Sequence, residues 1–369
     1  MRRSLTLLFW LILPAGSVLW AQAGNEEEAV MADTLVIAEE DFMDRINSRL
    51  PFTLSGGVDA YYLYTPSGEE FPTSFTSPPN SFNLGMANII LSREGKVGFV
   101  ADIAVGPRAE AANGLTGPTL AAIKQLYVDY SPADWLTFTL GNFGTFVGYE
   151  VIDATGNINY STSYLFSNGP FYHTGFKADI ALSDRFGLMV GVFNDTDNKL
   201  DETSGKHFGG QLSYASDRVG IYLNYLNGKE VEETDTTMAV YGHQFDLVAT
   251  LQATERLGLG LNASRKIRNQ EEADSRTWTG MALYANYAFS RVFTLGLRGE
   301  YFSDPDDQVL GVGDGNVLSL TASGNIHIDQ LTLIPEFRLD MASDPAFANE
   351  DGDMTETLPG FLLAMVYAF

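Results

Sequence analysis

Cysteine is absent from all 369 residues, so no disulfide holds the chain together and no cysteine is available for attachment of a lipid. This absence excludes the small secreted scaffolds that depend on disulfides. Basic residues are also scarce: 22 lysines and arginines face 47 aspartates and glutamates, which gives a formal net charge of −25. A chain this acidic repels nucleic acid, which we exclude as a partner.

Long apolar runs are missing beyond residue 23, and no later segment is long enough to form a transmembrane helix. The first 23 residues combine Arg2 and Arg3, an apolar run over residues 5–13 and the ending Ala21-Gln22-Ala23. These are the charged, apolar and small-residue parts of a secretory signal peptide. We predict that residues 1–23 are a signal peptide cleaved near Ala23. A membrane anchor is the alternative, since residues 5–23 could just span a bilayer.

Catalytic and metal-binding motifs are missing too. The four histidines, His173, His207, His243 and His327, are spread over four segments. The sequence has no zinc-protease motif, no nucleophile elbow and no complete calcium loop. We therefore predict no metal, no other cofactor and no enzymatic activity. A hydrolase with an active site at the outer rim of a barrel is the third hypothesis for function.

The sequence is rich in alternation. Glycine (36 residues) and aromatic residues (12%) are abundant, charged residues make up 19%, and the mean hydropathy is −0.03. In segment 331–341, for example, Leu331, Leu333 and Phe337 share one face and Glu336 and Arg338 share the other. Because successive strand side chains point to opposite faces, such a segment separates an apolar from a polar environment.

The connections between these segments distinguish a membrane barrel from a soluble sandwich. Short turns alternate with long connections, which are 65–80, 107–120, 144–170, 195–204, 228–238, 267–276, 303–314 and 342–355. Short turns at one end and long loops at the other are typical of an up-and-down membrane barrel. We predict an all-β fold, a transmembrane antiparallel up-and-down β-barrel of about sixteen strands (range 14–18), over residues 51–369.

The two flanks of the barrel are interpreted separately. Residues 24–50 are polar and are predicted to form a periplasmic N-terminal tail with one short amphipathic helix over residues 39–50; a plug inside the barrel is the alternative. Phe369 ends an aromatic-rich strand that resembles the C-terminal strand presented by bacterial outer-membrane proteins to the barrel-assembly machinery. We therefore expect this machinery as a partner and the outer membrane as the location.

Five segments in the first half of the predicted barrel have a distinctive sequence: Ser81–Asn88, Lys124–Tyr130, Gly141–Asp153, Asn157–Phe166 and Gly169–Gly175. Together these segments resemble the putative β-barrel porin family of outer-membrane proteins. The resemblance implies an outer-membrane channel for small hydrophilic solutes or ions, in contact with membrane lipid and lipopolysaccharide. Sixteen-stranded general porins are commonly trimers, which makes a homotrimer the expected assembly. A blocked barrel with a binding or structural role is the alternative function.

The third long connection is the candidate constriction. By resemblance to general porins, residues 144–170 are expected to fold into the lumen and narrow it, with Glu150, Asp153, Asn157 and Asn159 at the narrowing. The alternative for the two acids is that they cap turns or pair with nearby bases. A loop of this length is usually functional or disordered.

Charged residues in the inward phase of the predicted strands are expected to line the lumen. They comprise eight acids and four bases: Asp59, Lys96, Asp102, Asp129, Lys177, Asp179, Asp246, Arg298, Glu300, Glu336, Arg338 and Asp340. Charged rings of this kind set ion preference, so the excess of acids predicts a preference for cations. Lys177 with Asp179, or Arg298 with Glu300, could instead be cross-strand pairs that stabilise the wall.

Overall fold

A computed structural model describes residues 42–114, 118–234, 237–270, 273–310 and 315–369. The predicted signal peptide, its cleavage site near Ala23 and residues 24–41 of the tail lie outside the described residues. Within the predicted tail, helix α1 spans Phe42–Asn47. The Asn47 side chain exchanges hydrogen bonds of 3.0 and 2.8 Å with the backbone of Leu54, which ties α1 to the first strand. None of the described helices is long and apolar enough to cross a membrane.

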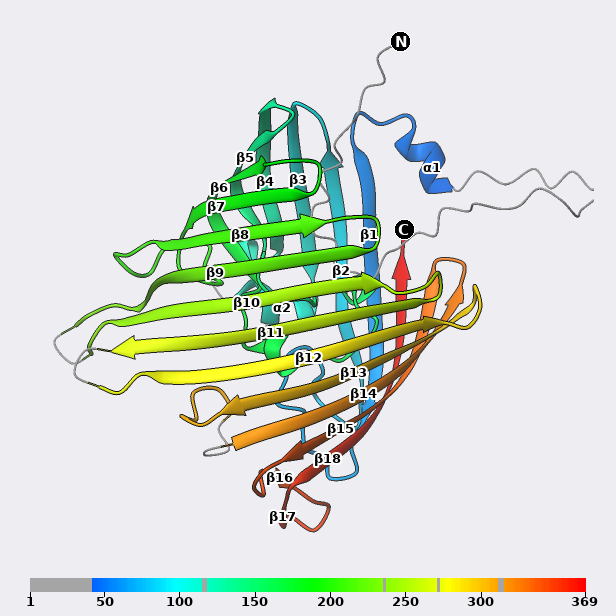
Figure 1. Cartoon of the computed structure of the whole chain (residues 1–369). Helices are drawn as coiled ribbons and strands as arrows, with labels where there is room; N and C mark the ends of the chain where they lie inside the picture. Colours follow the sequence, from blue (N-terminus) through cyan, green and yellow to red (C-terminus); the bar gives the residue numbers. More distant parts are fainter. Residues whose placement is uncertain (1–41, 115–117, 235–236, 271–272, 311–314) are drawn as a thin grey trace, which may run out of the picture.

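Sixteen antiparallel strands close into one barrel, as predicted (Figure 1). The strands of the barrel are β1 (Thr53–Tyr64), β2 (Ser81–Arg93), β3 (Val97–Val105), β4 (Ile123–Ala133), β5 (Leu136–Gly144), β6 (Tyr172–Ala181), β7 (Phe186–Phe193), β8 (His207–Ala215), β9 (Val219–Val231), β10 (Val240–Gln252), β11 (Leu257–Gln270), β12 (Arg276–Ala288), β13 (Phe293–Asp304), β14 (Gly315–Ile328), β15 (Leu331–Ala342) and β18 (Thr357–Ala368). Each strand pairs with its neighbour in sequence, and β18 closes the barrel on β1.

The connections confirm the predicted rhythm, with turns of two to four residues at one end and longer connections at the other. Two predicted loops, 228–238 and 267–276, are shorter in the structure because β9 and β11 continue through polar residues. There Lys229 pairs with Tyr241, and Ile267 pairs with His243. A strand that extends beyond the apolar band can keep its hydrogen bonds to the neighbouring strands while both of its faces contact water. The alternation of apolar and polar residues then no longer shows where the strand ends.

The outer face of the barrel is apolar and the inner face is polar. In β18, Phe361 and Leu363 are 55% and 52% exposed on the outer face, whereas Leu362 and Ala364 are buried on the inner face. In β15, Glu336 and Arg338 are buried on the inner face. This is the arrangement that lipid outside and protein or water inside require.

Some of the long connections, which all lie at one end of the barrel, fold into it and bury apolar side chains there. The helices α2 (Pro107–Asn113) and α3 (Pro118–Ala121) replace the predicted plain loop between β3 and β4, and a two-stranded sheet of β16 (Phe347–Ala348) and β17 (Met354–Thr355) lies between β15 and β18. Phe71, Leu310 and Phe347, from three different connections, join one buried cluster with Tyr164. The half of the barrel at the end of the long connections is therefore partly filled by packed loops.

Candidate functional site

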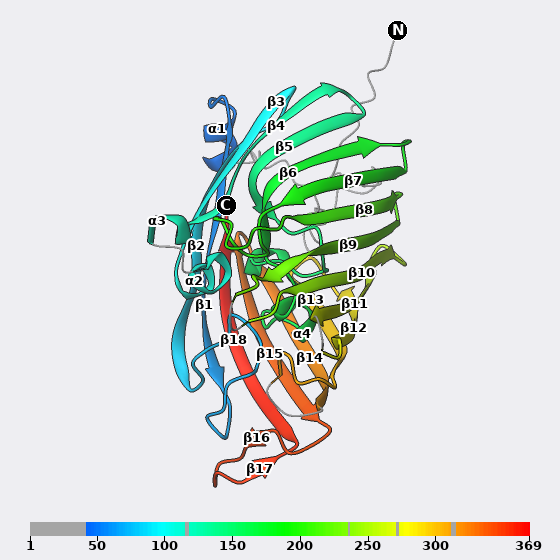
Figure 2. The ribbon, with the colours of Figure 1, turned by 90° about the vertical axis from the view of Figure 1, so that its left-hand side faces the viewer.

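The segment between β5 and β6, residues 145–171, lies inside the barrel. It contains the 3₁₀ turn η1 (Ala154–Gly156) and the short helix α4 (Tyr164–Ser167), which contacts β11, β12 and β13 (Figure 2). The Gly148 N–H donates to Asp246 on β10, and the Tyr160 N–H donates to Glu336 on β15. The segment is therefore attached to widely separated parts of the wall.

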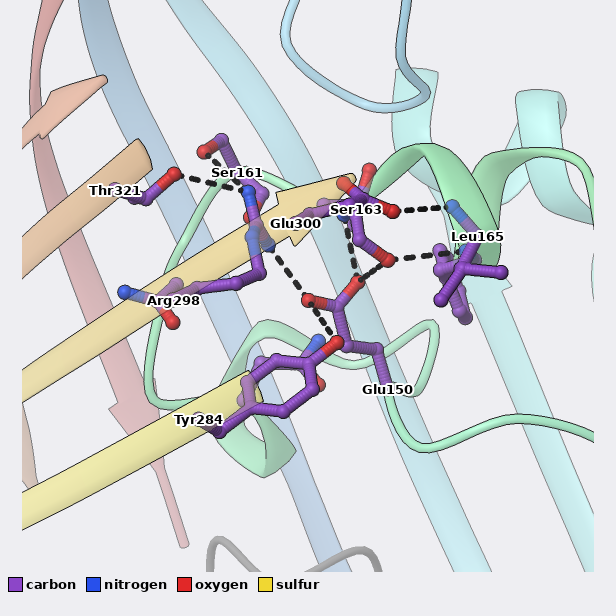
Figure 3. Close-up of polar contacts among 12 residues, drawn as sticks. Glu150, Ser161, Ser163, Leu165, Tyr284, Arg298, Glu300 and Thr321 are labelled. Carbon is purple, nitrogen blue, oxygen red and sulfur yellow. Dashed lines mark hydrogen bonds and ion pairs between the residues drawn. The ribbon is translucent and has the colours of Figure 1, made fainter. Parts of the chain in front are cut away.

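Glu150 joins the segment to the wall through a buried ion pair (Figure 3). Its Oε1 lies 2.6 Å from Nη1 of Arg298 on β13, and the two side chains are 4% and 0% exposed. Its Oε2 accepts hydrogen bonds from the Ser163 N–H at 2.7 Å and the Ser163 hydroxyl at 2.9 Å. Arg298 also donates to the Ser161 carbonyl at 2.6 Å. Breaking a buried pair of this kind by removing one partner costs about 3–5 kcal/mol.

Two wall carboxylates hold the backbone of the segment directly. Glu300 accepts from the N–H groups of Tyr164 and Leu165, both at 2.8 Å. Glu336 accepts from the N–H groups of Tyr160 and Ser161 at 2.7 and 3.0 Å. Hydrogen bonds to an ionised acceptor are about twice as strong as neutral ones, so these four bonds fix residues 160–165 against β13 and β15.

Tyrosine hydroxyls of the segment complete these contacts. Burial raises the pKa of both the Tyr160 and Tyr164 hydroxyls, so each stays protonated and donates. Tyr160 donates to Asp59 on β1, and Tyr164 donates to Asp340 on β15 at 2.7 Å. The segment therefore bridges the seam where the barrel closes.

A second ion-pair cluster holds the middle of the segment to the opposite strands. The Nζ of Lys124 lies 2.6 Å from both Asp102 and Asp153, and Asn88 donates to both carboxylates at 3.1 Å. Lys124 is the extra residue of a β-bulge between β3 and β4, where Asp102 pairs with Gln125 and the next residue of β3 pairs with Ile123. A bulge re-aims a side chain, which explains why simple alternation did not assign Lys124 to the lumen.

Arg108 was not identified from the sequence because it lies on α2, in the predicted loop 107–120. Its guanidinium is buried, with Nε 3.7 Å from Oδ2 of Asp59. The same group lies over the rings of Phe75 and Tyr160, at 5.0 and 4.7 Å from their centroids. Contacts between a cation and ring faces of this kind are favourable when desolvated.

The remaining predicted residues lie in several places. Lys96, predicted to line the lumen, is instead exposed in the short turn between β2 and β3, because β3 begins only at Val97. Asn157 braces the segment internally, accepting from the Val151 N–H at 3.0 Å, and Asn159 donates to Ser323 on β14 at 2.6 Å. Lys177 and Asp179 form an ion pair of 2.8 Å along β6, with each side chain about one-fifth exposed. Asp129 on β4 is half-buried on the inner face. Arg338 pairs with Asp340 at 2.8 Å and donates to the Thr162 carbonyl.

The charges around the segment do not balance. Eight carboxylates and four cations are gathered there: Asp59, Asp102, Glu150, Asp153, Asp246, Glu300, Glu336 and Asp340 against Arg108, Lys124, Arg298 and Arg338. Among the described residues, Asp246, Glu300 and Glu336 have no cation within ion-pair distance and are held by N–H, hydroxyl or amide donors. The interior of the barrel therefore carries negative potential even where individual acids are paired.

A closed sixteen-stranded barrel with an apolar outside, a polar inside and an inward-folded third connection defines an outer-membrane porin-type channel protein. The chain belongs to the family described as putative beta-barrel porin-2, OmpL-like, whose model matches residues 51–369. No curated protein sequence matches the chain at a significant level.

Solved structures of outer-membrane proteins share this fold. The "anion-selective porin from Comamonas acidovorans" is 12% identical, with 86% of this chain and 99% of that chain covered and a TM-score of 0.61. The outer-membrane channel DcaP of Acinetobacter baumannii is 12% identical, with coverage of 86% and 97% and a TM-score of 0.59. A trimer form of OmpT from Vibrio cholerae is 8% identical, with coverage of 86% and 99% and a TM-score of 0.57. At these identities the likeness shows the fold alone.

Proposed function

We propose that the chain is a narrow outer-membrane channel for passive diffusion of small hydrophilic solutes, in which residues 145–171 set the narrowest part. The observation that carries this proposal is the attachment of the segment to β1, β4, β10, β13 and β15 from inside the barrel. A sixteen-stranded barrel is wide enough for an aqueous lumen, and an anchored segment reduces its bore. Swelling of liposomes loaded with the protein, using sugars of increasing size, tests the proposal.

The same channel is proposed to prefer cations. The support is the excess of carboxylates around residues 145–171, together with the half-buried Asp129 and Asp179. Glu150 and Asp153 contribute to this excess although each has a basic partner, since the pairing leaves other acids uncompensated. Negative potential in a narrow, low-dielectric passage raises local cation concentration. The reversal potential in a salt gradient tests the sign.

The alternative is a blocked barrel with a binding or structural role. The observation in its favour is that residues 159–166 are all buried, as expected for a packed plug. Correctly folded protein that gives neither swelling nor conductance would establish the alternative.

We infer that the protein is not an enzyme. The four histidines bond separately, to Thr145, Thr196, Tyr225 and Thr332, on parts of the barrel that do not meet in one catalytic arrangement among the described residues. A panel of peptide and lipid substrates, incubated with pure protein, tests for rim hydrolysis.

Processing and assembly complete the proposal. Residues 1–23 are removed on export, residues 24–50 remain as a periplasmic tail, and Phe369 presents the last strand to the barrel-assembly machinery. The mature chain forms a homotrimer in contact with lipid and lipopolysaccharide, in keeping with the trimer form of the Vibrio cholerae structure. N-terminal sequencing of the exported protein should give Gly24 first, and light scattering in detergent should give three chains per particle.

A further inference from the structure

The outer face of strands β9 to β13 carries one basic side chain that the channel function does not use. Outward-phase residues in these strands are odd-numbered, and none of them is aspartate or glutamate. Only Lys229 and Arg265 are permanently charged among them. Lys229 is engaged by Glu232 at 3.0 Å and by the Ser204 hydroxyl at 3.0 Å. Arg265 is exposed and makes no side-chain hydrogen bond or ion pair within the described part of the chain.

The height of Arg265 on the wall follows from the register. The continuous apolar outer stripe of β11 runs from Leu257 to Ala263 and is interrupted by Arg265; above it only Ile267 is apolar before the polar Asn269. Arg265 pairs with Phe245 on β10 and with Thr279 on β12, and Thr279 lies directly above the apolar stripe that starts at Met281. Apolar bands of outer-membrane barrels are about 25 Å tall and end in aromatic girdles. Arg265 therefore lies at the extracellular edge of the band.

The neighbouring aromatic residues support this placement. Tyr225 on β9 and Phe245 on β10 are 36% and 52% exposed and form a directly opposed pair at the level of Arg265, and Tyr301 on β13, 49% exposed, pairs with Met281 one outward position lower. An arginine at the middle of the membrane would cost about 2–4 kcal/mol, whereas near the interface the cost falls to about 0–1 kcal/mol. The position is tolerable for a guanidinium, and the groups available to an unpaired guanidinium at this level are lipid headgroups.

Polar groups beside Arg265 complete a donor set. His243 lies diagonally across the β10–β11 pair, a separation of about 7–8 Å between such positions. Its Nδ1 is 2.8 Å from the Tyr225 hydroxyl. When that hydroxyl donates to Nδ1, the neutral imidazole carries its proton on Nε2 and presents a donor. Thr279 adds a hydroxyl on the other side. The outward-phase residues of these strands include no carboxylate, and the nearby Asp306, from the connection after β13, is engaged by the N–H and hydroxyl of Thr277 at 2.6 and 3.4 Å.

We propose that Arg265, with His243 and Thr279, binds a phosphate of an outer-leaflet phosphorylated glycolipid on the outside of the barrel. A planar guanidinium matches a phosphate in a bidentate manner, and charge-assisted bonds of this kind are the strong ones. The acidic extracellular loops could hold such lipids only through bridging divalent cations, whereas Arg265 needs none. The site does not depend on whether the lumen conducts.

The test is native mass spectrometry of the full mature protein in detergent with EDTA, titrated with diphosphorylated lipid A. R265Q should bind roughly tenfold more weakly than the unmodified protein, which corresponds to about 1.4 kcal/mol. R265K keeps the positive charge but loses the planar guanidinium that can donate two parallel hydrogen bonds. Its affinity for lipid A should lie between those of R265Q and the unmodified protein. R276Q is the matched control, because Arg276 is exposed at the same end of the barrel but on the inner phase of β12. It should bind as tightly as the unmodified protein.

Two further binding experiments identify the ligand, and a folding check on each variant excludes unfolding as the cause of weaker binding. Dephosphorylated lipid A should bind the unmodified protein and R265Q equally, and millimolar inorganic phosphate should not displace lipid A. Each variant must keep its β-sheet circular dichroism and its heat-modifiable migration in gels. Equal lipid A binding by R265Q and the unmodified protein would overturn the proposal. So would an equal loss in R276Q, or displacement by inorganic phosphate, which would make free phosphate the ligand.

Discussion

Replacing Glu300 by glutamine tests whether the inward segment is held by wall carboxylates. Glu300 is fully buried, accepts from the N–H groups of Tyr164 and Leu165, and forms no ion pair. Neutralising it therefore leaves no described cation without a partner. The amide of glutamine keeps one acceptor oxygen but turns an N–H₂ group toward a backbone N–H. Losing one charge-assisted bond, weakening the other and leaving a buried donor unpaired together cost about 3 kcal/mol.

That free energy predicts an effect large enough to measure. A loss of about 3 kcal/mol raises the population in which α4 is detached by roughly a hundredfold. Hydrogen exchange at the amides of Tyr164 and Leu165 should accelerate by about the same factor. Single-channel records should show higher conductance and more open-channel noise. E255Q is the control, since Glu255 is an exposed carboxylate in a short turn. Unchanged exchange and unchanged conductance in E300Q would refute the anchoring argument.

Three other changes test separate parts of the structure. D153N should lower cation preference without unfolding the protein, because Lys124 keeps its second carboxylate; reversal potentials measure this. G228A should lower the urea midpoint by the equivalent of about 1–3 kcal/mol, because a Cβ there would lie 1.8 Å from a histidine ring, whereas G299A, with 3.6 Å to its nearest side chain, should not. Burial raises the pKa of Asp197 to about 6. The folded state thus binds the proton more tightly than the unfolded state does. The free energy of unfolding should therefore fall as the pH rises from about 4 to about 6 in the unmodified protein, but not in D197N.

The wall of the barrel was predictable because every strand faces two different environments. Leu331, Leu333 and Phe337 against Glu336 and Arg338 already separate the outside from the inside. Strand number followed from the alternation of short and long connections. Strand ends were less predictable, because β9 and β11 extend into water, where both faces are polar.

The contacts inside the barrel were not predictable, because they join residues far apart in the chain. Glu150 and Arg298 are 148 positions apart, and Tyr160 and Glu336 are 176 positions apart. The alternation of apolar and polar residues correctly predicted that Arg298 and Glu336 face the inside of the barrel. No pattern in a single sequence predicts which loop atoms bind them. Lys124 was missed because its orientation depends on a bulge, which reverses the alternation locally.

The most direct test of the proposed channel is single-channel recording of the refolded chain, residues 24–369, in a planar bilayer with a potassium chloride gradient. We expect discrete conductance steps and a reversal potential of the sign given by cation preference, because residues 145–171, the proposed constriction, are anchored amid an excess of carboxylates. Correctly folded protein that gives no steps would contradict the proposed channel. Steps with a reversal potential of the opposite sign would contradict the proposed selectivity.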